Sequence, residues 1–241
     1  MKLKSILLIA AGILIASYPI AKNIYTGYMQ RKVLKEWEEE RRAVQYQFNQ
    51  SGADTSEASE DAINSYLFLD EAFSDLNNDE TTESIDDDNK GNKNTKSFVT
   101  LGVIKIDKID LVLPVMDGAT PEILKIGAGK LTGTTDIGEI GNTAISAHRS
   151  HAYGRNFNRL NEVELGDIVV ISTLDADFTY EVFNIQVVEP DDVSVLKKSE
   201  TESILTLITC HPLYIASHRL IVQAKLISTT YNINSESQAL R

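Results

Sequence analysis

The sequence has a single cysteine, Cys210, among 241 residues. One thiol cannot close a disulfide within the chain, so Cys210 is inert, paired with another molecule or reactive. The cysteine stands alone and the four histidines lack ligand spacing with carboxylates, so no metal-binding cluster is visible. We therefore expect no metal ion and no other cofactor.

Positive charge is also scarce. The chain carries 23 Lys and Arg against 35 Asp and Glu, a net charge of -12, and the acidic excess is greatest between residues 51 and 96. Binding to nucleic acid requires a positive face, so we exclude a nucleic-acid partner. The triplet Asp86–Asp88 lacks the alternating ligands, the glycine and the distal glutamate of a calcium loop, and we interpret it as solvated linker.

Long apolar runs are limited to one, the uncharged stretch Ser5–Ala21. Its 17 residues are at the lower limit of a membrane span, and lysines at positions 2, 4 and 22 flank it. We interpret residues 1–25 as an N-terminal transmembrane signal anchor. With the positive residues Lys2 and Lys4 kept inside, the expected location is the cell membrane, crossed once, with everything after Lys22 on the extracytoplasmic face.

A cleaved signal peptide is the alternative interpretation of this run. Its apolar core would have about 7 to 15 residues and would precede a cleavage site of small residues. Here the run is longer, and the candidate sites near Ala16 and Ala21 are crowded by Tyr18, Pro19 and Lys22. The uncleaved anchor is therefore preferred.

The segment after the anchor, residues 26–50, has mixed charges and few helix breakers. Its pairs Lys35/Glu39 and Glu38/Arg42 have helical spacing. We predict a solvated juxtamembrane helix, and we expect the N-terminal helical region to contact membrane lipid.

Two further segments are polar. Residues 51–96 are rich in Asp, Glu, Ser, Thr and Asn and are predicted to be an acidic flexible linker. Within it, AINSYLFLDEAF (Ala62–Phe73) is apolar enough to form one helical turn or two and to dock elsewhere. Residues 230–241 form a polar tail with no second membrane span.

Short apolar segments separated by turns begin at residue 98. The candidate strands are 98–107, 111–118, 141–148, 167–173, 178–189, 203–210 and 218–227. Short helices are expected at 120–129, where Thr120 and Pro121 form a start signal, and at 154–163. Strands at this spacing, without crossover helices, predict an all-β fold: a closed, mainly antiparallel barrel over residues 97–229.

The stretch TLITCHPLYIASHRLIV, residues 206–222, raises the question of what Cys210 does. A lone cysteine at the end of an apolar strand is usually a small buried hydrophobe. The strand must end at His211 and Pro212, because proline has no N–H for the ladder, so Cys210 lies at a strand end. The next strand most simply returns as a hairpin and brings Arg219 close to the cysteine.

A cysteine nucleophile needs a cation or a base nearby, because an ordinary thiol is only a few per cent thiolate at neutral pH. A histidine can fill this role and can later protonate a leaving amine. His148 ends a strand at an edge equivalent to that of Cys210, and His151 follows in a loop. His211 and His218 directly adjoin the cysteine and the arginine, and would point away from them along a strand.

These segments resemble the sortases of Gram-positive bacteria. The resemblance rests on TLITC followed by Pro212, on HRLIV with Arg219, and on ISAHR some sixty residues upstream. It extends over roughly Gly102–Ile227 and includes GAGKLTGTTDIGEIGNTAISAHR, FNRLNEVELGD and VVEPDDVSVL. The fold that it implies is the sortase β-barrel, with the cysteine and the arginine on neighbouring strands, as the hairpin prediction places them.

The resemblance implies that Cys210 is the nucleophile, His148 the acid and base, and Arg219 the stabilising cation. It implies a cysteine transpeptidase that cleaves an LPxTG-like C-terminal sorting signal through a thioester. A peptidoglycan-precursor amine would then accept the surface protein, which joins it to the cell wall. His151 and the two histidines of the hairpin are expected at surface or supporting positions.

Within the family, a single N-terminal anchor, a polar tail and the phrase AHRSHAYGRNFNRL are most like class D. Pilin-polymerising class C enzymes are the alternative; they typically add a second membrane span and a lid with an Asp-Pro-aromatic motif, which residues 62–96 lack. A further hypothesis is that Ala62–Phe73 forms a different kind of lid over the cleft. Two more alternatives are a secreted thiol endopeptidase and an anchored β-barrel binding module with an inert cysteine.

Overall fold

The computed structural model describes residues 24–42, 60–70, 72–73 and 98–232. The predicted anchor run Ser5–Ala21, the triplet Asp86–Asp88 and the tail from residue 233 lie outside the described residues. Among the helices of the described residues, none combines the length and the hydrophobicity needed to cross a membrane.

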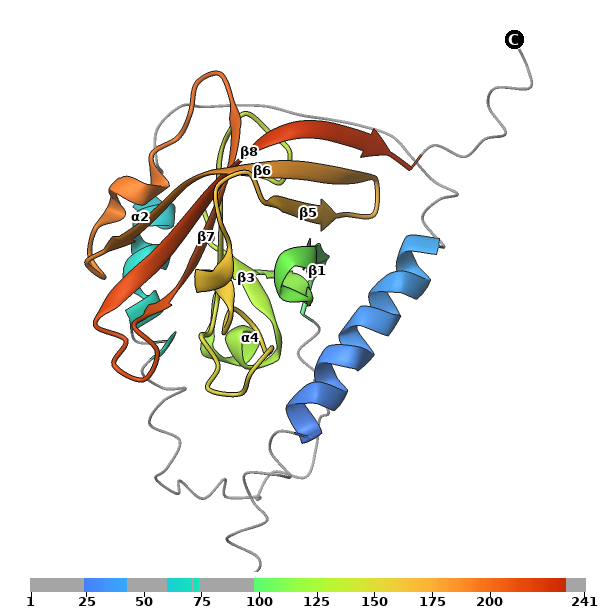
Figure 1. The fold of residues 1–241 in the computed structure, drawn as a ribbon. Helices are drawn as coiled ribbons and strands as arrows, with labels where there is room; N and C mark the ends of the chain where they lie inside the picture. Colours follow the sequence, from blue (N-terminus) through green and yellow to red (C-terminus); the bar gives the residue numbers. More distant parts are fainter. Residues whose placement is uncertain (1–23, 43–59, 71, 74–97, 233–241) are drawn as a thin grey trace, which may run out of the picture.

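Eight strands form a closed barrel in the order β1-β2-β3-β4-β7-β8-β6-β5 (Figure 1). They are β1 (Thr100–Ile106), β2 (Leu111–Asp117), β3 (Ala128–Lys130), β4 (Gly141–Ala147), β5 (Ile168–Ser172), β6 (Ala176–Val188), β7 (Ser203–His211) and β8 (His218–Tyr231). Strands β2 and β3 pair in parallel, as do β4 and β7, and the other pairs are antiparallel. The prediction of a closed, mainly antiparallel barrel is confirmed.

Strand β3 was not predicted, because its three residues lie in the glycine-rich GAGK. A Cβ on Gly129 would lie 2.2 Å from the carbonyl oxygen of Gly118, which directly follows β2. Only glycine allows the two backbones to pass this closely. The glycines of GAGK therefore help to close the barrel, although they carry no strand propensity.

The connections contain short helices and 3-10 turns. These are η1 (Asp107–Ile109), α4 (Pro121–Ile126), η2 (Leu160–Glu162) and η3 (Val193–Leu196). Helix α4 begins as predicted, with the Thr120 side chain accepting a hydrogen bond from the Ile123 N–H at 3.5 Å. The helix predicted over 154–163 is wrong in extent, since Gly154 (φ 72°) and Asn156 (φ 48°) are left-handed and interrupt a right-handed helix.

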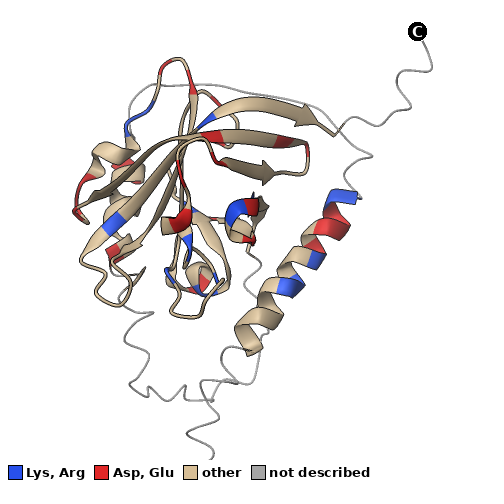
Figure 2. Ribbon diagram, in the orientation of Figure 1, with Lys and Arg blue, Asp and Glu red and all other residues tan. Residues whose placement is uncertain are grey.

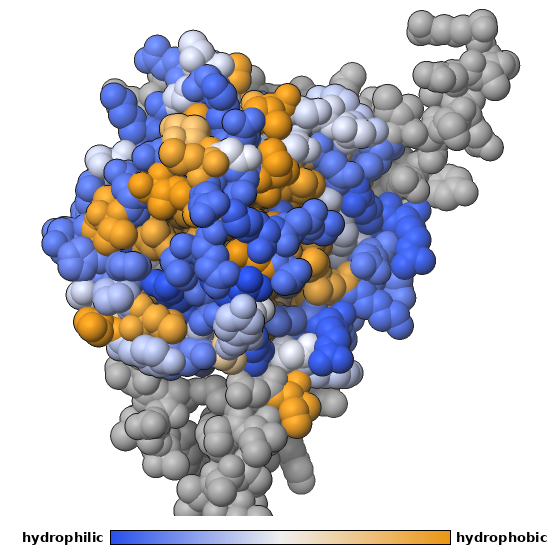
Figure 3. Space-filling view, viewed as in Figure 1, coloured by the Kyte–Doolittle hydropathy of each residue, from blue (hydrophilic) through white to orange (hydrophobic). Residues whose placement is uncertain are grey.

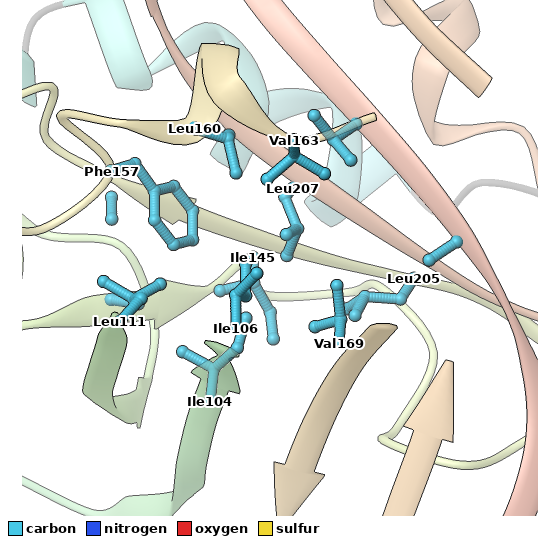
Figure 4. Close-up of a cluster of buried hydrophobic side chains, with 14 of the residues drawn as sticks. Ile104, Ile106, Leu111, Ile145, Phe157, Leu160, Val163, Val169, Leu205 and Leu207 are labelled. Carbon is cyan, nitrogen blue, oxygen red and sulfur yellow. The ribbon is translucent and has the colours of Figure 1, made fainter. Parts of the chain in front are cut away.

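Apolar side chains fill the barrel interior (Figure 4). Leu205 and Leu207 of β7 pack there with Ile145 of β4, and Phe157 and Leu160 reach the same cluster from the connection between β4 and β5. Burial of each such side chain stabilises the fold by about 1.5–3 kcal/mol. The alternate residues of β7 must therefore face outward.

The outward face of β7 carries a second apolar cluster, which contains Ile208 and Cys210. Helix α2 (Glu60–Leu67) and the turn that follows it cover this cluster with Tyr66 and Leu69, next to Leu196 of η3. In Figure 1, α2 lies on the opposite side of the barrel from the helix of residues 24–42. The predicted docking of Ala62–Phe73 thus takes place on the strand that bears the cysteine.

The helix over residues 24–42 lies against the barrel instead of standing free in solvent (Figure 1). Trp37 is 5% exposed, and Arg41 forms an ion pair of 2.8 Å with Asp177 of β6. Gln30 donates a hydrogen bond of 2.8 Å to the side chain of Asn156. The charged residues of this helix begin near its middle and continue to its C-terminal end (Figure 2), and the expected i,i+4 pairs are present at 3.8 Å.

The barrel exterior mixes polar and apolar side chains, which alternate in patches on the face shown in Figure 3. Exposed apolar side chains of the strands include Phe183, Val187 and Ile227. Such exposure is common on antiparallel sheets with one solvated face, so it does not by itself mark a binding surface.

Candidate active site

The hairpin of β7 and β8 brings Cys210 and Arg219 together. The two residues are direct cross-strand partners, and Arg219 Nη1 lies 3.8 Å from Cys210 Sγ. The same nitrogen donates hydrogen bonds to the carbonyl oxygens of Ala216 at 3.2 Å and His218 at 3.0 Å. Ala216 lies in the turn of the hairpin and His218 is the first residue of β8. These two carbonyls therefore hold the guanidinium beside the sulfur.

His148 reaches the same place from β4. Because β4 runs parallel to β7, with Ser146 opposite Ile208, the residue after Ala147 lies at the same barrel end as Cys210. His148 and Cys210 line one small pocket, whose space is about 10 Å³, roughly enough for one water molecule. The structure therefore brings the three predicted residues to one end of the barrel.

Cys210 is 4% exposed and lies beside apolar side chains of the outer cluster. Burial raises the pKa of this thiol to about 12, and the positive charge of Arg149 opposes the rise. Loss of solvation disfavours the charged form of an acid, so the thiol is protonated at neutral pH in this arrangement. A nucleophilic role requires a different environment from the one described.

Residues 60–70 and 72–73, called the covering segment below, contribute to this burial, since Tyr66, Leu69 and Phe73 belong to the same cluster as Cys210. Asp70 forms an ion pair with Nη2 of Arg219, although its own side chain is 60% exposed. The Phe73 ring lies 5.3 Å from Cζ of Arg219 and 6.3 Å from the His148 ring. One carboxylate and one aromatic ring thus occupy the space around the cation and the histidine, and leave little room for a peptide.

The other histidines occupy three different environments. His151 lines the pocket, where its ring lies 4.5 Å from the ring of Tyr214. His211 Nδ1 lies 3.0 Å from Nη1 of Arg149. His218 Nε2 lies 3.3 Å from a carboxylate oxygen of Glu189. Of the three, His151 is the one that lines the same pocket as His148 and Cys210, whereas the sequence places it only in a loop.

Three residues of the site were not assigned a role from the sequence. Asp70 and Phe73 lie in YLFLDEAF, whose apolar character marked it as a docking segment without indicating a target. Arg149 follows His148 in ISAHR, where its 6% exposure could not be foreseen. Among the described residues, no three His, Cys, Asp or Glu are placed to hold a metal ion.

Comparisons with known proteins match this chain to sortases. The family model described as "Sortase domain" matches residues 104–227, just over half of the chain. "Sortase D" of Bacillus subtilis is 29% identical over 143 residues, which cover 58% of this chain and 70% of that protein.

Solved structures agree with this match. A Streptococcus pneumoniae sortase C superposes with a TM-score of 0.57 at 30% identity, covering 83% of this chain and 98% of that one. A Clostridium perfringens "Sortase D5 transpeptidase" superposes with a TM-score of 0.55 at 25% identity, covering 83% and 99%. The barrel, the cysteine and arginine of its hairpin and these matches together show that the protein belongs to the sortase family of cysteine transpeptidases.

Proposed function

We propose that this sortase is anchored in the membrane by its N-terminus and cleaves an LPxTG-like sorting signal through a thioester on Cys210. It then transfers the surface protein to an amine of a cell-wall precursor. The observation that carries the proposal is the convergence of sulfur, guanidinium and imidazole: Arg219 Nη1 lies 3.8 Å from Sγ, and His148 lines the same pocket.

The chemistry follows from these groups. The Cys210 thiolate attacks the threonine carbonyl carbon, and the tetrahedral intermediate collapses to a thioester as His148 protonates the departing amine. The acceptor amine then attacks the thioester, its proton passes to His148, and the cysteine leaves as thiolate. Throughout, Arg219 donates hydrogen bonds toward the developing oxyanion, a geometry that its planar fork suits better than a lysine would.

The covering segment must leave before this reaction can begin. In the described arrangement Asp70 neutralises Arg219, and Phe73 packs against the same guanidinium. Release would free the Nη2 nitrogen and admit water to the thiol, which favours the thiolate. We therefore interpret the covering segment as a lid over the active site.

Class D remains the proposed class, supported by the likeness to the Bacillus and Clostridium enzymes. A class C pilin-polymerising sortase is the second candidate. Its support is the position of Asp70 and Phe73 over Arg219, because an acidic and an aromatic residue in a lid are features of that class. This chain has two residues between them, where the class C motif has a proline.

The test is incubation of the purified full chain with a panel of LPxTx peptides and candidate amines, read by mass. We expect a thioester on Cys210 and an amide product, no product with Cys210→Ala, and most of the activity with His151→Ala. Equal loss in the two variants would contradict the assignment of roles.

The alternatives give different products in the same experiment. A thiol endopeptidase gives only the free acid, and a binding module gives no adduct on Cys210. Transfer to a lysine of a folded pilin-like domain, in preference to a peptidoglycan amine, would favour class C.

A further inference from the structure

Arg149 is the residue directly after His148, and its side chain is buried, with 6% exposure. Its Nη1 donates to the carbonyl oxygen of Cys210 at 3.3 Å and lies 3.0 Å from Nδ1 of His211. Because arginine only donates, Nδ1 of His211 must accept, which fixes the proton of the neutral ring on Nε2.

The rest of the guanidinium is held by the connection between β4 and β5. Nη2 donates to the Asn161 side-chain oxygen at 2.7 Å, and Nε donates to the carbonyl oxygen of Asn158 at 3.4 Å. Arg149 also pairs with Asn156 through an isolated backbone bridge. The side chain therefore ties two points of this connection to the last two residues of β7, and the backbone of Arg149 holds a third.

The partners of Arg149 in the described part of the chain are all neutral. They are two carbonyl groups, one amide and one imidazole, and the pKa of His211 is lowered by burial and by the charges of Arg149 and His218. A buried cation without an opposite charge is costly, because the protein replaces only part of its hydration. Such an arrangement is favourable where an anion forms nearby during function.

We propose that Arg149 is a positioning residue for the transpeptidation: it fixes the backbone of His148 relative to that of Cys210, and its buried charge stabilises the Cys210 thiolate. The proposal rests on the proposed role of Cys210 as nucleophile. It adds a second cation to the site, one that stays available while Asp70 is paired with Arg219.

Other charged and titratable groups face the thiol from each neighbouring element. Arg219 approaches from β8, with Asp70 of the covering segment as its ion-pair partner; burial lowers the pKa of Arg219, and Tyr66 of α2 opposes this lowering. His148 lines the pocket from the end of β4, His151 from the loop after it, and Tyr214 from the turn of the hairpin. Of the two arginines, only Arg219 has a carboxylate partner among the described residues, so the uncompensated charge is that of Arg149.

The positional part of the proposal follows from the strand arrangement. The parallel pairing of β4 with β7 ends at Ser146 and Ile208, before either catalytic residue is reached. Thr209 adds one link, since its hydroxyl donates to the Ala147 carbonyl at 2.8 Å. Beyond that point, the Arg149 side chain links the segment after β4 to the end of β7. The separation of the His148 imidazole from the Cys210 sulfur therefore depends on the Arg149 guanidinium. Lysine would preserve the charge but not this geometry.

The first experiment measures the pH dependence of Cys210 alkylation in the full chain without any peptide. Every variant carries Asp70→Asn, so that the covering segment limits the access of the reagent to Cys210 to the same extent in all of them. Arg149→Gln should raise the midpoint of the alkylation curve by about one pH unit, whereas Arg149→Lys should leave it within a few tenths. Arg159→Gln is the matched control: this arginine of the same connection pairs with Glu162 and Asp110, so its loss should not move the midpoint.

The second experiment measures acylation with the LPxTx peptide that the wild type accepts. Arg149→Lys should lower kcat by about tenfold or more with KM little changed, since misplacement of a reacting group affects the chemical step. An unshifted midpoint in Arg149→Gln overturns the electrostatic part, and a wild-type kcat in Arg149→Lys overturns the positional part. If Arg149→Gln does not fold, the kcat of Arg149→Lys still decides whether the positional part of the proposal holds.

The two experiments separate this proposal from the proposed function. Alkylation involves no peptide, so its outcome is the same whether or not the chain is a transpeptidase. Failure of the wild type to form a thioester with any peptide contradicts the proposed function and leaves the alkylation result standing.

Discussion

Asp70 pairs with Arg219 across 149 positions of sequence, and Arg219 is the cross-strand partner of Cys210. The ion pair joins the covering segment to the candidate nucleophile through one guanidinium. Docking of the covering segment and neutralisation of the active-site cation are therefore the same event. Several measurable properties of the Cys210 thiol depend on whether the covering segment is docked.

Loss of the carboxylate should loosen the covering segment. An ion pair with an exposed partner contributes about 1 kcal/mol, which corresponds to about a fivefold change in the open population. We expect Asp70→Asn to speed alkylation of Cys210 by about that factor. Asp61→Asn, on the exposed part of α2, is the control and should react at the wild-type rate; equal acceleration in both variants would exclude a specific role for the ion pair.

Phe73 should contribute more than Asp70, because its side chain is 2% exposed. Truncation of a buried phenylalanine costs about 3–5 kcal/mol, which here is a loss of docking free energy. Phe73→Ala should accelerate alkylation by more than tenfold and raise the rate of peptide acylation. Since both side chains contact Arg219, the double variant should show a non-additive rate in a double-mutant cycle; strict additivity would argue against a shared contact.

The buried thiol should make stability depend on pH in the alkaline range. Burial raises the pKa of Cys210 to about 12 in the folded state, above the value of about 8.5 for a thiol in the unfolded chain. The folded state therefore keeps a proton that the unfolded state loses. The resulting stabilisation by the proton is complete below pH about 8.5 and is lost as pH rises toward about 12, by up to 1.4 kcal/mol per unit.

The check is urea unfolding of the wild type and Cys210→Ala from about pH 8 upward. The free energy of unfolding of the wild type should fall relative to that of the variant, which has no thiol to titrate. Parallel curves would mean that the thiol is not buried in the folded protein in solution.

Replacement of Arg219 by lysine tests the geometry of the cation separately from its charge. The lysine would lose the planar guanidinium, whose Nη1 contacts the sulfur and the Ala216 and His218 carbonyls and whose Nη2 is free for a second acceptor once the covering segment leaves. We expect Arg219→Lys to reduce kcat for acylation by about a hundredfold, the usual effect of losing one oxyanion donor. A near-normal kcat in this variant would mean that Arg219 acts through its positive charge alone and not through the geometry of its guanidinium.

Asn142 of β4 should be important for stability. Its amide donates to the carbonyl oxygens of Val195 at 2.9 Å and Lys197 at 3.1 Å, and its side-chain oxygen accepts from the Thr206 hydroxyl at 2.7 Å. Asn142→Ala leaves buried groups unpaired and should lower the free energy of unfolding by about 2–3 kcal/mol.

The control for Asn142 is Asn184→Ala, which removes one hydrogen bond to Gln223 on a half-buried surface. It should cost about 1 kcal/mol or less. Thermal or urea unfolding of both variants is the measurement, and a similar loss in the two would contradict the special role of Asn142 in holding η3.

The local pattern of apolar and polar residues was sufficient to predict most strands of the barrel. Alternation in SILTLITC places Leu205 and Leu207 on one face of the strand and Ile208 and Cys210 on the other, and the structure has the first pair in the barrel interior and the second in the outer cluster. Local pattern failed where close backbone approach, not propensity, forms the element, as in β3. It also failed over 154–163, where left-handed residues replace the expected helix.

The sequence by itself determined the hairpin that pairs Cys210 with Arg219, because a proline ends one strand and an alternating apolar run begins the next. It also placed His148 at a strand end. Only the tertiary structure decided that Asp70 and Phe73 lie on Arg219 and that Arg149 reaches the carbonyl of Cys210. Strand patterns depend on neighbouring residues, whereas these contacts depend on how the closed barrel brings distant segments together and on the apolar area buried when they dock.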